Sequence, residues 1–326
     1  MKDFRGWDAV PDLVLILVIT LVTICLLIVH VPVVYFGDAA NNLAYSRHLI
    51  RTGQWAFTAH SDGQPHIPST FVTTDNVHFH VRYPPGSMLV FATAELVCGE
   101  WGLRATNLLF GIAGIVLFYR TLLLLFPRWF AAAGAIALLL TPAYLFFMAS
   151  YMTHPLSMFF ILGAFYLVVR APESNHPAWF AASAGLCIGA AVATRYINIL
   201  ILPLLGLSVI VPLFQDGKPR IRSLVVPMFG RAAGFALGAG VVMILLACYH
   251  TVQFGGPFIT GYELAGETSP FNLRHFSSNL PNVTTLFLNY SGIAVPLALM
   301  GIYRLIRRGN ILRLVVLVGW MSQFLL

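Results

Sequence analysis

The sequence predicts an all-α, polytopic membrane protein with about nine transmembrane helices and two interfacial helices in its first external loop. Composition is the first observation, because 58% of the 326 residues are hydrophobic and only 10% are charged, whereas soluble domains carry about 25% charged residues. The second is a series of apolar runs, several of which approach the roughly 20 residues that cross a bilayer. The third is the concentration of polar residues in two long segments between these runs.

The apolar runs define one domain over residues 1–326. The first run is too long for a signal-peptide core and lacks a clear cleavage site, so we expect an uncleaved first helix. The chain ends inside the last run, which is typical of a truncated or reduced form of a longer protein. The predicted spans are 11–36, 105–126, 130–149, 155–169, 178–194, 197–214, 224–249, 284–302 and 311–326.

The distribution of Lys and Arg predicts the orientation, since cytoplasmic loops are enriched in both. A cytoplasmic N-terminus puts most of them on the cytoplasmic side, so the net charge of +7 reflects topology rather than nucleic-acid binding. Two long external loops result, at about 37–104 and 250–283. We therefore expect a multi-pass protein of the inner or plasma membrane, surrounded by membrane lipids, with its site on the external or periplasmic face.

The first external loop begins with a predicted interfacial helix. Asp38, Asn41, Asn42 and Tyr45 share one helical face, and Gly53 is a typical helix stop. Short strands or irregular chain are expected over 58–80. A second interfacial helix is predicted over 87–97, because that apolar segment is too short to span a membrane.

Asp38 and Arg82 are the main candidates for chemistry. Asp38 directly follows the first span, where its carboxylate suits a general base, although an Asp before a helix is equally typical of an N-cap. Arg82 precedes two prolines in RYPPG, which hold the chain extended. Its guanidinium suits a lipid phosphate, and the alternative is a side chain that reaches from the membrane to the interface.

Weaker candidates occur elsewhere on the predicted external side. His154 begins the 155–169 span and Arg195 follows the 178–194 span, so each is either a substrate contact or an ordinary turn residue. His78 and His80 share a strand face and raise the question of a divalent cation, although no third ligand has a specific spacing. The remaining candidate substrate contacts are Tyr45, Tyr83 and Glu263.

The order of these features resembles the membrane glycosyltransferases of the GT-C class. The matching segments are FGDAANNLAYSRHLIRTGQW, RYPPGSMLVFATAELVCGEWGLRATNLLFGIAGIVLFYR, YMTHPLSMFFILGAFYLVVRA and AGLCIGAAVATRYINILILPLL. The sequence is most similar to the family-39-like group, which includes protein O-mannosyltransferases and lipid A aminoarabinose transferases. Where many members carry an acidic residue at an external turn, this chain has His154.

The resemblance implies a glycosyltransferase that moves a sugar from a polyprenyl-phosphate donor to a hydroxyl of a lipid, glycan or protein acceptor. It implies Asp38 as the catalytic carboxylate and an outward-facing site without an obligatory metal cofactor. No Walker loop or GxGxxG motif occurs, so soluble nucleotide cofactors are not expected. The alternatives are a membrane transporter, or a non-catalytic relative of the GT-C fold.

Overall fold

The computed structural model describes residues 9–28, 37–58, 71–73, 75, 77–124, 126–171, 174–210, 221–266, 281, 282, 285 and 303. The helices are α1 (Val10–Ile28), α2 (Gly37–Thr52), α3 (Gly86–Leu123), α4 (Arg128–Leu139), α5 (Pro142–Met148), α6 (His154–Arg170), α7 (Pro177–Thr194), the 3-10 helix η3 (Tyr196–Leu200), α8 (Ile201–Ile210), α9 (Ile221–Phe254) and α10 (Gly261–Leu264). The strands are β1 (Phe57–Thr58), β2 (Phe71–Thr73) and β3 (His78–Val81).

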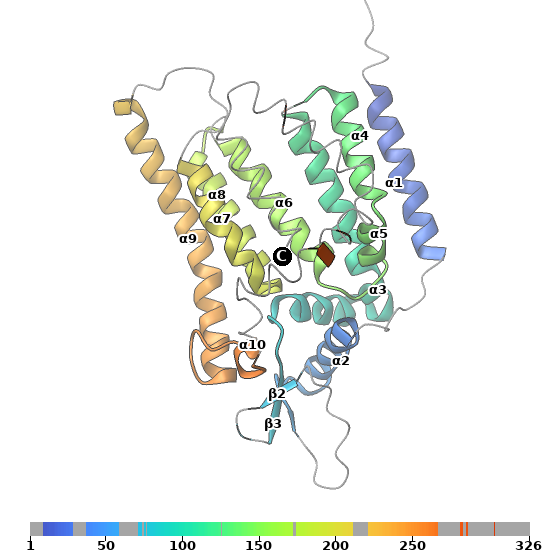
Figure 1. Cartoon of the computed structure of the whole chain (residues 1–326), viewed down its shortest axis with the longest axis vertical. Helices are drawn as coiled ribbons and strands as arrows, with labels where there is room; N and C mark the ends of the chain where they lie inside the picture. Colours follow the sequence, from blue (N-terminus) through green and yellow to red (C-terminus); the bar gives the residue numbers. More distant parts are fainter. Residues whose placement is uncertain are drawn as a thin grey trace, which may run out of the picture.

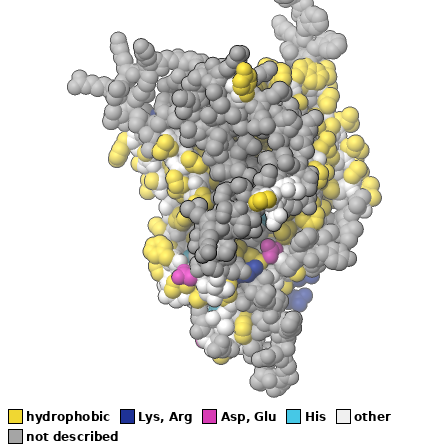
Figure 2. Space-filling view, viewed as in Figure 1, with side chains coloured by type: hydrophobic (Ala, Val, Ile, Leu, Met, Phe, Trp, Pro, Cys, Tyr) yellow, Lys and Arg dark blue, Asp and Glu magenta, His cyan; other side chains and the backbone are white. Residues whose placement is uncertain are grey.

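The long helices form a bundle, and α2, α10 and the strands lie together at one end of it (Figure 1). Hydrophobic side chains cover the flanks of the bundle, while most of the visible charged side chains lie towards the end that carries α2 and α10 (Figure 2). This separation is the one expected for a protein whose sides meet lipid and whose polar segments meet an aqueous face.

The multi-pass character predicted from the sequence is confirmed, but the number of nine spans is not. Within the described residues, four helices are long and apolar enough to cross a membrane, and the pair α4 and α5, bent by 65°, would make a fifth. Two predicted spans correspond to the shorter apolar helices His154–Arg170 and Tyr196–Val209. The predicted spans 284–302 and 311–326 lie outside the described residues, except for residue 285.

Helix α3 combines the predicted second interfacial helix with the next predicted span. Its backbone breaks at Gly99, where φ is 61° and ψ is −149°. The part before Gly99 lies across the end of the bundle, and the part after it runs along the bundle (Figure 1). The helix predicted over 87–97 is therefore present, and its position at a membrane interface stays a prediction.

Helices α7 and α9 pack against each other through small residues. A Cβ added to Gly185 would collide with the carbonyl oxygen of Phe235, and one added to Gly238 would collide with that of Ala182. Small residues allow such close backbone approach, which is typical of helices that associate within a membrane. Helices α6 and α8 pack against this pair.

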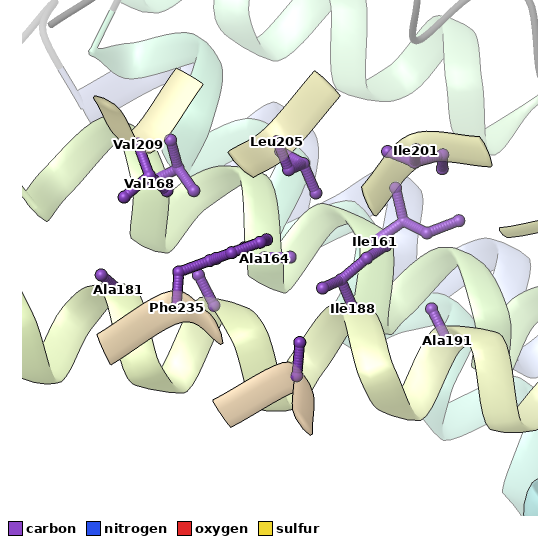
Figure 3. Close-up of a cluster of buried hydrophobic side chains, with 12 residues drawn as sticks. Ile161, Ala164, Val168, Ala181, Ile188, Ala191, Ile201, Leu205, Val209 and Phe235 are labelled. Atoms are coloured by element: carbon purple, nitrogen blue, oxygen red, sulfur yellow. The ribbon is translucent and has the colours of Figure 1, made fainter. Parts of the chain in front are cut away.

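The largest core cluster lies where four helices meet (Figure 3). Phe235 of α9 lies between side chains from α6, α7 and α8. The side chains that share this cluster include Ile161, Val168, Ile188 and Leu205. The cluster connects α9, which leads to α10, to α7, which ends directly before Arg195.

Helix α2 is present over nearly the predicted residues and ends before Gly53, whose φ is 68°. Its polar face points into the protein rather than towards water. Asn42 Nδ2 donates to the Tyr151 carbonyl at 3.1 Å, and Ser46 Oγ donates to the Met88 carbonyl at 3.2 Å. These contacts explain the inward face, because polar groups can be buried when they find hydrogen-bond partners.

The expected short strands form a three-stranded antiparallel sheet in the order β1-β3-β2. Phe57 pairs with Phe79, and Val72 pairs with His80. Strand β3 leads directly into the RYPPG segment, so the sheet determines the position of the Arg82 backbone.

We expect Gly99→Ala to destabilise the protein by about 1–3 kcal/mol, because a residue with a side chain is strained at this φ and ψ. The measurement is the apparent Tm of the detergent-solubilised protein. Gly240→Ala in α9 is the control, since an added Cβ there meets open space. An equal Tm for the Gly99→Ala variant and the wild type would contradict the placement of the backbone break of α3 at Gly99.

Candidate functional site

A carboxylate, a phenol and a guanidinium form the centre of the candidate site. Asp38 lies in the first turn of α2, and Arg82 and Tyr83 lie between β3 and α3. The Tyr83 hydroxyl donates a hydrogen bond to Asp38 Oδ1 and accepts one from Arg82 Nη2 at 3.2 Å. The two main candidates from the sequence, Asp38 and Arg82, are therefore joined through Tyr83.

The hydrogen bond to Tyr83 bears on the choice between capping and chemistry at Asp38. Helix α2 begins at Gly37, so Asp38 lies inside the helix rather than directly before it. Its side chain is exposed and bonds to a residue 45 positions away. An acidic residue in a first turn still interacts favourably with the helix dipole, so both effects operate at this position.

The prolines and Gly86 place the RYPPG segment against the end of α7. Pro85 precedes the first residue of α3, a position that suits proline because a helix start needs no N–H donor there. A Cβ added to Gly86 would lie 2.5 Å from the carbonyl oxygen of Ala193. This close approach brings the segment next to Arg195, which directly follows α7.

Arg195 is a second cation near Asp38. Its backbone N–H donates to the Ala191 carbonyl at 2.9 Å, which ends α7. Burial lowers the pKa of the Arg195 guanidinium, while Tyr262 and the charge of Asp38 act in the opposite direction. Arg195 nevertheless stays protonated at neutral pH, so the site holds a partly buried positive charge.

Tyr83 remains a hydroxyl donor over the physiological pH range. Its burial raises the pKa of the phenol, and the hydrogen bond to Asp38 raises it further, while Arg82 acts in the opposite direction. A protonated Tyr83 keeps the Asp38 carboxylate oriented.

An aromatic wall, which we define as Trp55, Tyr196, Tyr249, His250 and Tyr262, lies beside these residues. Tyr196 OH lies 2.8 Å from His250 Nε2, and the ring centroids of Trp55 and Tyr249 are 5.2 Å apart. His250 Nδ1 donates to the Pro257 carbonyl at 3.3 Å, so its other ring nitrogen accepts from Tyr196. The wall joins the two segments that the sequence predicts as external loops, and sequence reasoning missed it because no regular spacing connects its members.

His154 is the first residue of α6 and stacks on Phe147, with centroids 3.8 Å apart and an interplanar angle of 3°. It is close enough to Arg195 for their charges to interact. The two turns that carry His154 and Arg195 therefore lie near each other in the fold. A substrate contact by His154 stays a prediction.

The other candidates have different surroundings. Tyr45 is fully buried and its hydroxyl donates to the Trp55 carbonyl, so it supports the aromatic wall. Glu263 lies in α10 with an exposed side chain. Substrate contacts by either residue stay predictions.

The two histidines of β3 do not share a metal-ligand cluster. His78 Nδ1 pairs with Asp75 Oδ2 at 2.6 Å, whereas the buried His80 contacts the ring of Phe254 at 5.8 Å. Within the residues that the structure describes, no group of three or more His, Cys, Asp or Glu side chains could hold a metal ion.

Asn107 is a supporting residue that sequence reasoning also missed. Its Nδ2 donates to the carbonyls of Ser150 and of Met152, the latter at 2.6 Å. These bonds hold the turn that leads to His154 against α3. The signal for Asn107 in the sequence is that it is a lone amide in an apolar run, because a polar group within a membrane span needs hydrogen-bond partners.

The comparisons with known proteins agree with this architecture. The apolar helices and the family match identify a multi-pass membrane glycosyltransferase of the GT-C class. Residues 84–244 match the model of the dolichyl-phosphate-mannose-protein mannosyltransferase family, and this match confirms the resemblance inferred from the sequence. The matched residues include His154 and Arg195, whereas Asp38 and Arg82 precede them. No curated protein and no solved structure matches the chain.

We expect Asn107→Ala to lower the free energy of unfolding by about 1–3 kcal/mol, because buried carbonyls would lose their donor. Thermal unfolding of the purified protein measures this effect. Thr106→Ala is the matched control, since the Thr106 hydroxyl bonds only within its own helix, to the Gly102 carbonyl. Equal destabilisation by both substitutions would argue against the proposed anchoring role.

Proposed function

We propose that the protein transfers a sugar from a polyprenyl-phosphate donor to an acceptor hydroxyl, with Asp38 as the general base. The observation that carries this proposal is the link from Asp38 through Tyr83 to Arg82, with Arg195 nearby. Such a site offers a proton acceptor and a phosphate-binding region within one cluster. A lipid, glycan or protein supplies the acceptor hydroxyl.

The proposed reaction is a single displacement at the anomeric carbon. The acceptor oxygen forms a new bond to that carbon while its proton passes to the Asp38 carboxylate. The bond from the anomeric carbon to the phosphate oxygen breaks, and its electron pair leaves with the polyprenyl phosphate. Attack from the face opposite the phosphate inverts the configuration of the sugar.

Charge stabilisation is the main task of the cationic residues. Arg82 and Arg195 would bind the phosphate, whose negative charge increases as the bond to the sugar breaks. Arginine suits this role because its planar N–H donors match phosphate oxygens in pairs. Burial of Arg195 strengthens the effect, since charges interact more strongly where water is excluded.

The proposed mechanism needs no obligatory divalent cation. The described part of the chain offers one exposed carboxylate at the site centre and two arginines around it, which is a poor donor set for a metal and a suitable one for a phosphate. We place this reaction on the external face of the cell membrane, where the positive-inside distribution puts α2 and α10.

Replacement of Asp38 by Asn tests the general base directly. Asn preserves the size of the side chain and can still accept a hydrogen bond from Tyr83, but it cannot take up the acceptor proton. We expect Asp38→Asn to lower kcat for sugar transfer by about 100-fold or more, the usual range for a lost general base. The measurement is transfer of a labelled sugar from polyprenyl phosphate in native membranes.

Asp75→Asn is the matched control, because Asp75 lies outside the site and its side chain is exposed. We expect it to transfer sugar at the wild-type rate. Activity of the Asp38→Asn variant within a few-fold of the wild type would reject Asp38 as the base. A wild-type protein without transfer activity on any such donor would favour a non-catalytic relative of the fold.

Replacement of Arg82 tests the phosphate site. We expect Arg82→Ala to raise KM for the donor by about 10- to 100-fold, because a charge-assisted bidentate contact is lost. Donor titration in the same assay measures KM. Arg51→Ala is the control, since Arg51 is an exposed arginine at the end of α2, and an equal KM change in both variants would point to a general effect of charge at the membrane surface.

A further inference from the structure

Helix α10 lies against the backbone of Arg82. Thr260 precedes this helix, and its side chain accepts a hydrogen bond from the Glu263 N–H at 3.2 Å, which defines where the helix begins. A Cβ added to Gly261 would collide with the Arg82 backbone. The second external loop is therefore seated directly on the residue that the proposed function assigns to the donor phosphate.

The ring of Tyr262, the next residue of α10, lies close to the guanidinium of Arg82. Arg82 Cζ lies 5.7 Å from the centroid of the Tyr262 ring and 5.2 Å from that of Tyr83. The Tyr262 ring also makes edge contacts with Tyr83 at 5.9 Å and with Tyr196 at 5.8 Å. Two aromatic rings therefore restrict the position of the Arg82 side chain.

An aromatic partner orients an arginine differently from a carboxylate. A ring attracts the cation through its negative face and leaves the net charge in place. A ring contact therefore orients a guanidinium without neutralising it.

We propose that Tyr262 is a positioning residue, which holds the Arg82 guanidinium in the orientation that binds the phosphate of the lipid-linked donor. Gly261 makes this possible, because it lets α10 approach the Arg82 backbone closely enough for the neighbouring ring to reach the guanidinium. The proposal deepens the proposed function and rests on it for the role of Arg82. It assigns to the second external loop a part in donor binding that does not involve direct contact with the sugar.

The test measures binding of polyprenyl monophosphate to the full chain in lipid nanodiscs, so that it does not depend on sugar transfer or on Asp38. The variants are Tyr262→Ala, Tyr262→Phe, Arg82→Ala and the double variant of Tyr262→Ala with Arg82→Ala. Leu264→Ala is the matched control, because Leu264 lies in the same short helix with an exposed side chain. Thermal unfolding of each variant checks that the fold is retained.

We expect Tyr262→Ala to weaken binding by about 10-fold, the range for loss of a partly buried cation–π contact. Tyr262→Phe should bind within about twofold of the wild type, because the ring remains. In the Arg82→Ala background, the further change Tyr262→Ala should weaken binding by less than about twofold, since a residue that acts only through another shows no independent effect.

Four results would overturn the proposal. An equal loss in the Tyr262→Phe and Tyr262→Ala variants would assign the effect to the hydroxyl. A full loss on adding Tyr262→Ala to Arg82→Ala would show that Tyr262 acts independently of Arg82. Wild-type binding by the Arg82→Ala variant would overturn the phosphate role of Arg82 and with it the role of Tyr262. Weakened binding by the Arg82→Ala variant, together with wild-type binding by the Tyr262→Ala variant, would overturn only the role of Tyr262.

Discussion

The hydroxyl of Tyr83 lies between a carboxylate and a guanidinium, and the arrangement of the polar end depends on this bridge. The bridge requires α2, β3 and the start of α3 to meet at one point. The carboxylate of Asp38 and the guanidinium of Arg82 are therefore held in one cluster around the Tyr83 hydroxyl.

The position of this bridge is set by contacts with the apolar bundle. Gly86 lets the RYPPG segment approach the end of α7 closely, and α7 is held by its tight packing on α9. On the other side, Gly261 lets α10 approach Arg82. The site is therefore a junction between the two polar segments and the bundle, where small residues permit backbone contacts that larger ones would prevent.

Buried amides connect the polar end to the interior. Asn42 and Asn107 donate to carbonyls of the segment between α5 and α6, and Asn198 Nδ2 donates to Ser157 Oγ and to the Ala191 carbonyl, both at 2.7 Å. Each bond satisfies a group that would be costly to bury without a partner. These amides hold the helix ends that carry His154 and Arg195, so they support the site without belonging to it.

The sequence by itself determined the membrane class, the amphipathic helix after the first span and the stop at Gly53, and it singled out Asp38 and Arg82 as candidates. Composition and helical periodicity are local properties, and each can be read from neighbouring residues. Only the tertiary structure decided that the polar face of α2 turns inward, that Tyr83 bridges Asp38 and Arg82, and that Tyr262 reaches Arg82. These contacts join residues far apart in the chain, and no spacing in the sequence encodes a distance in space.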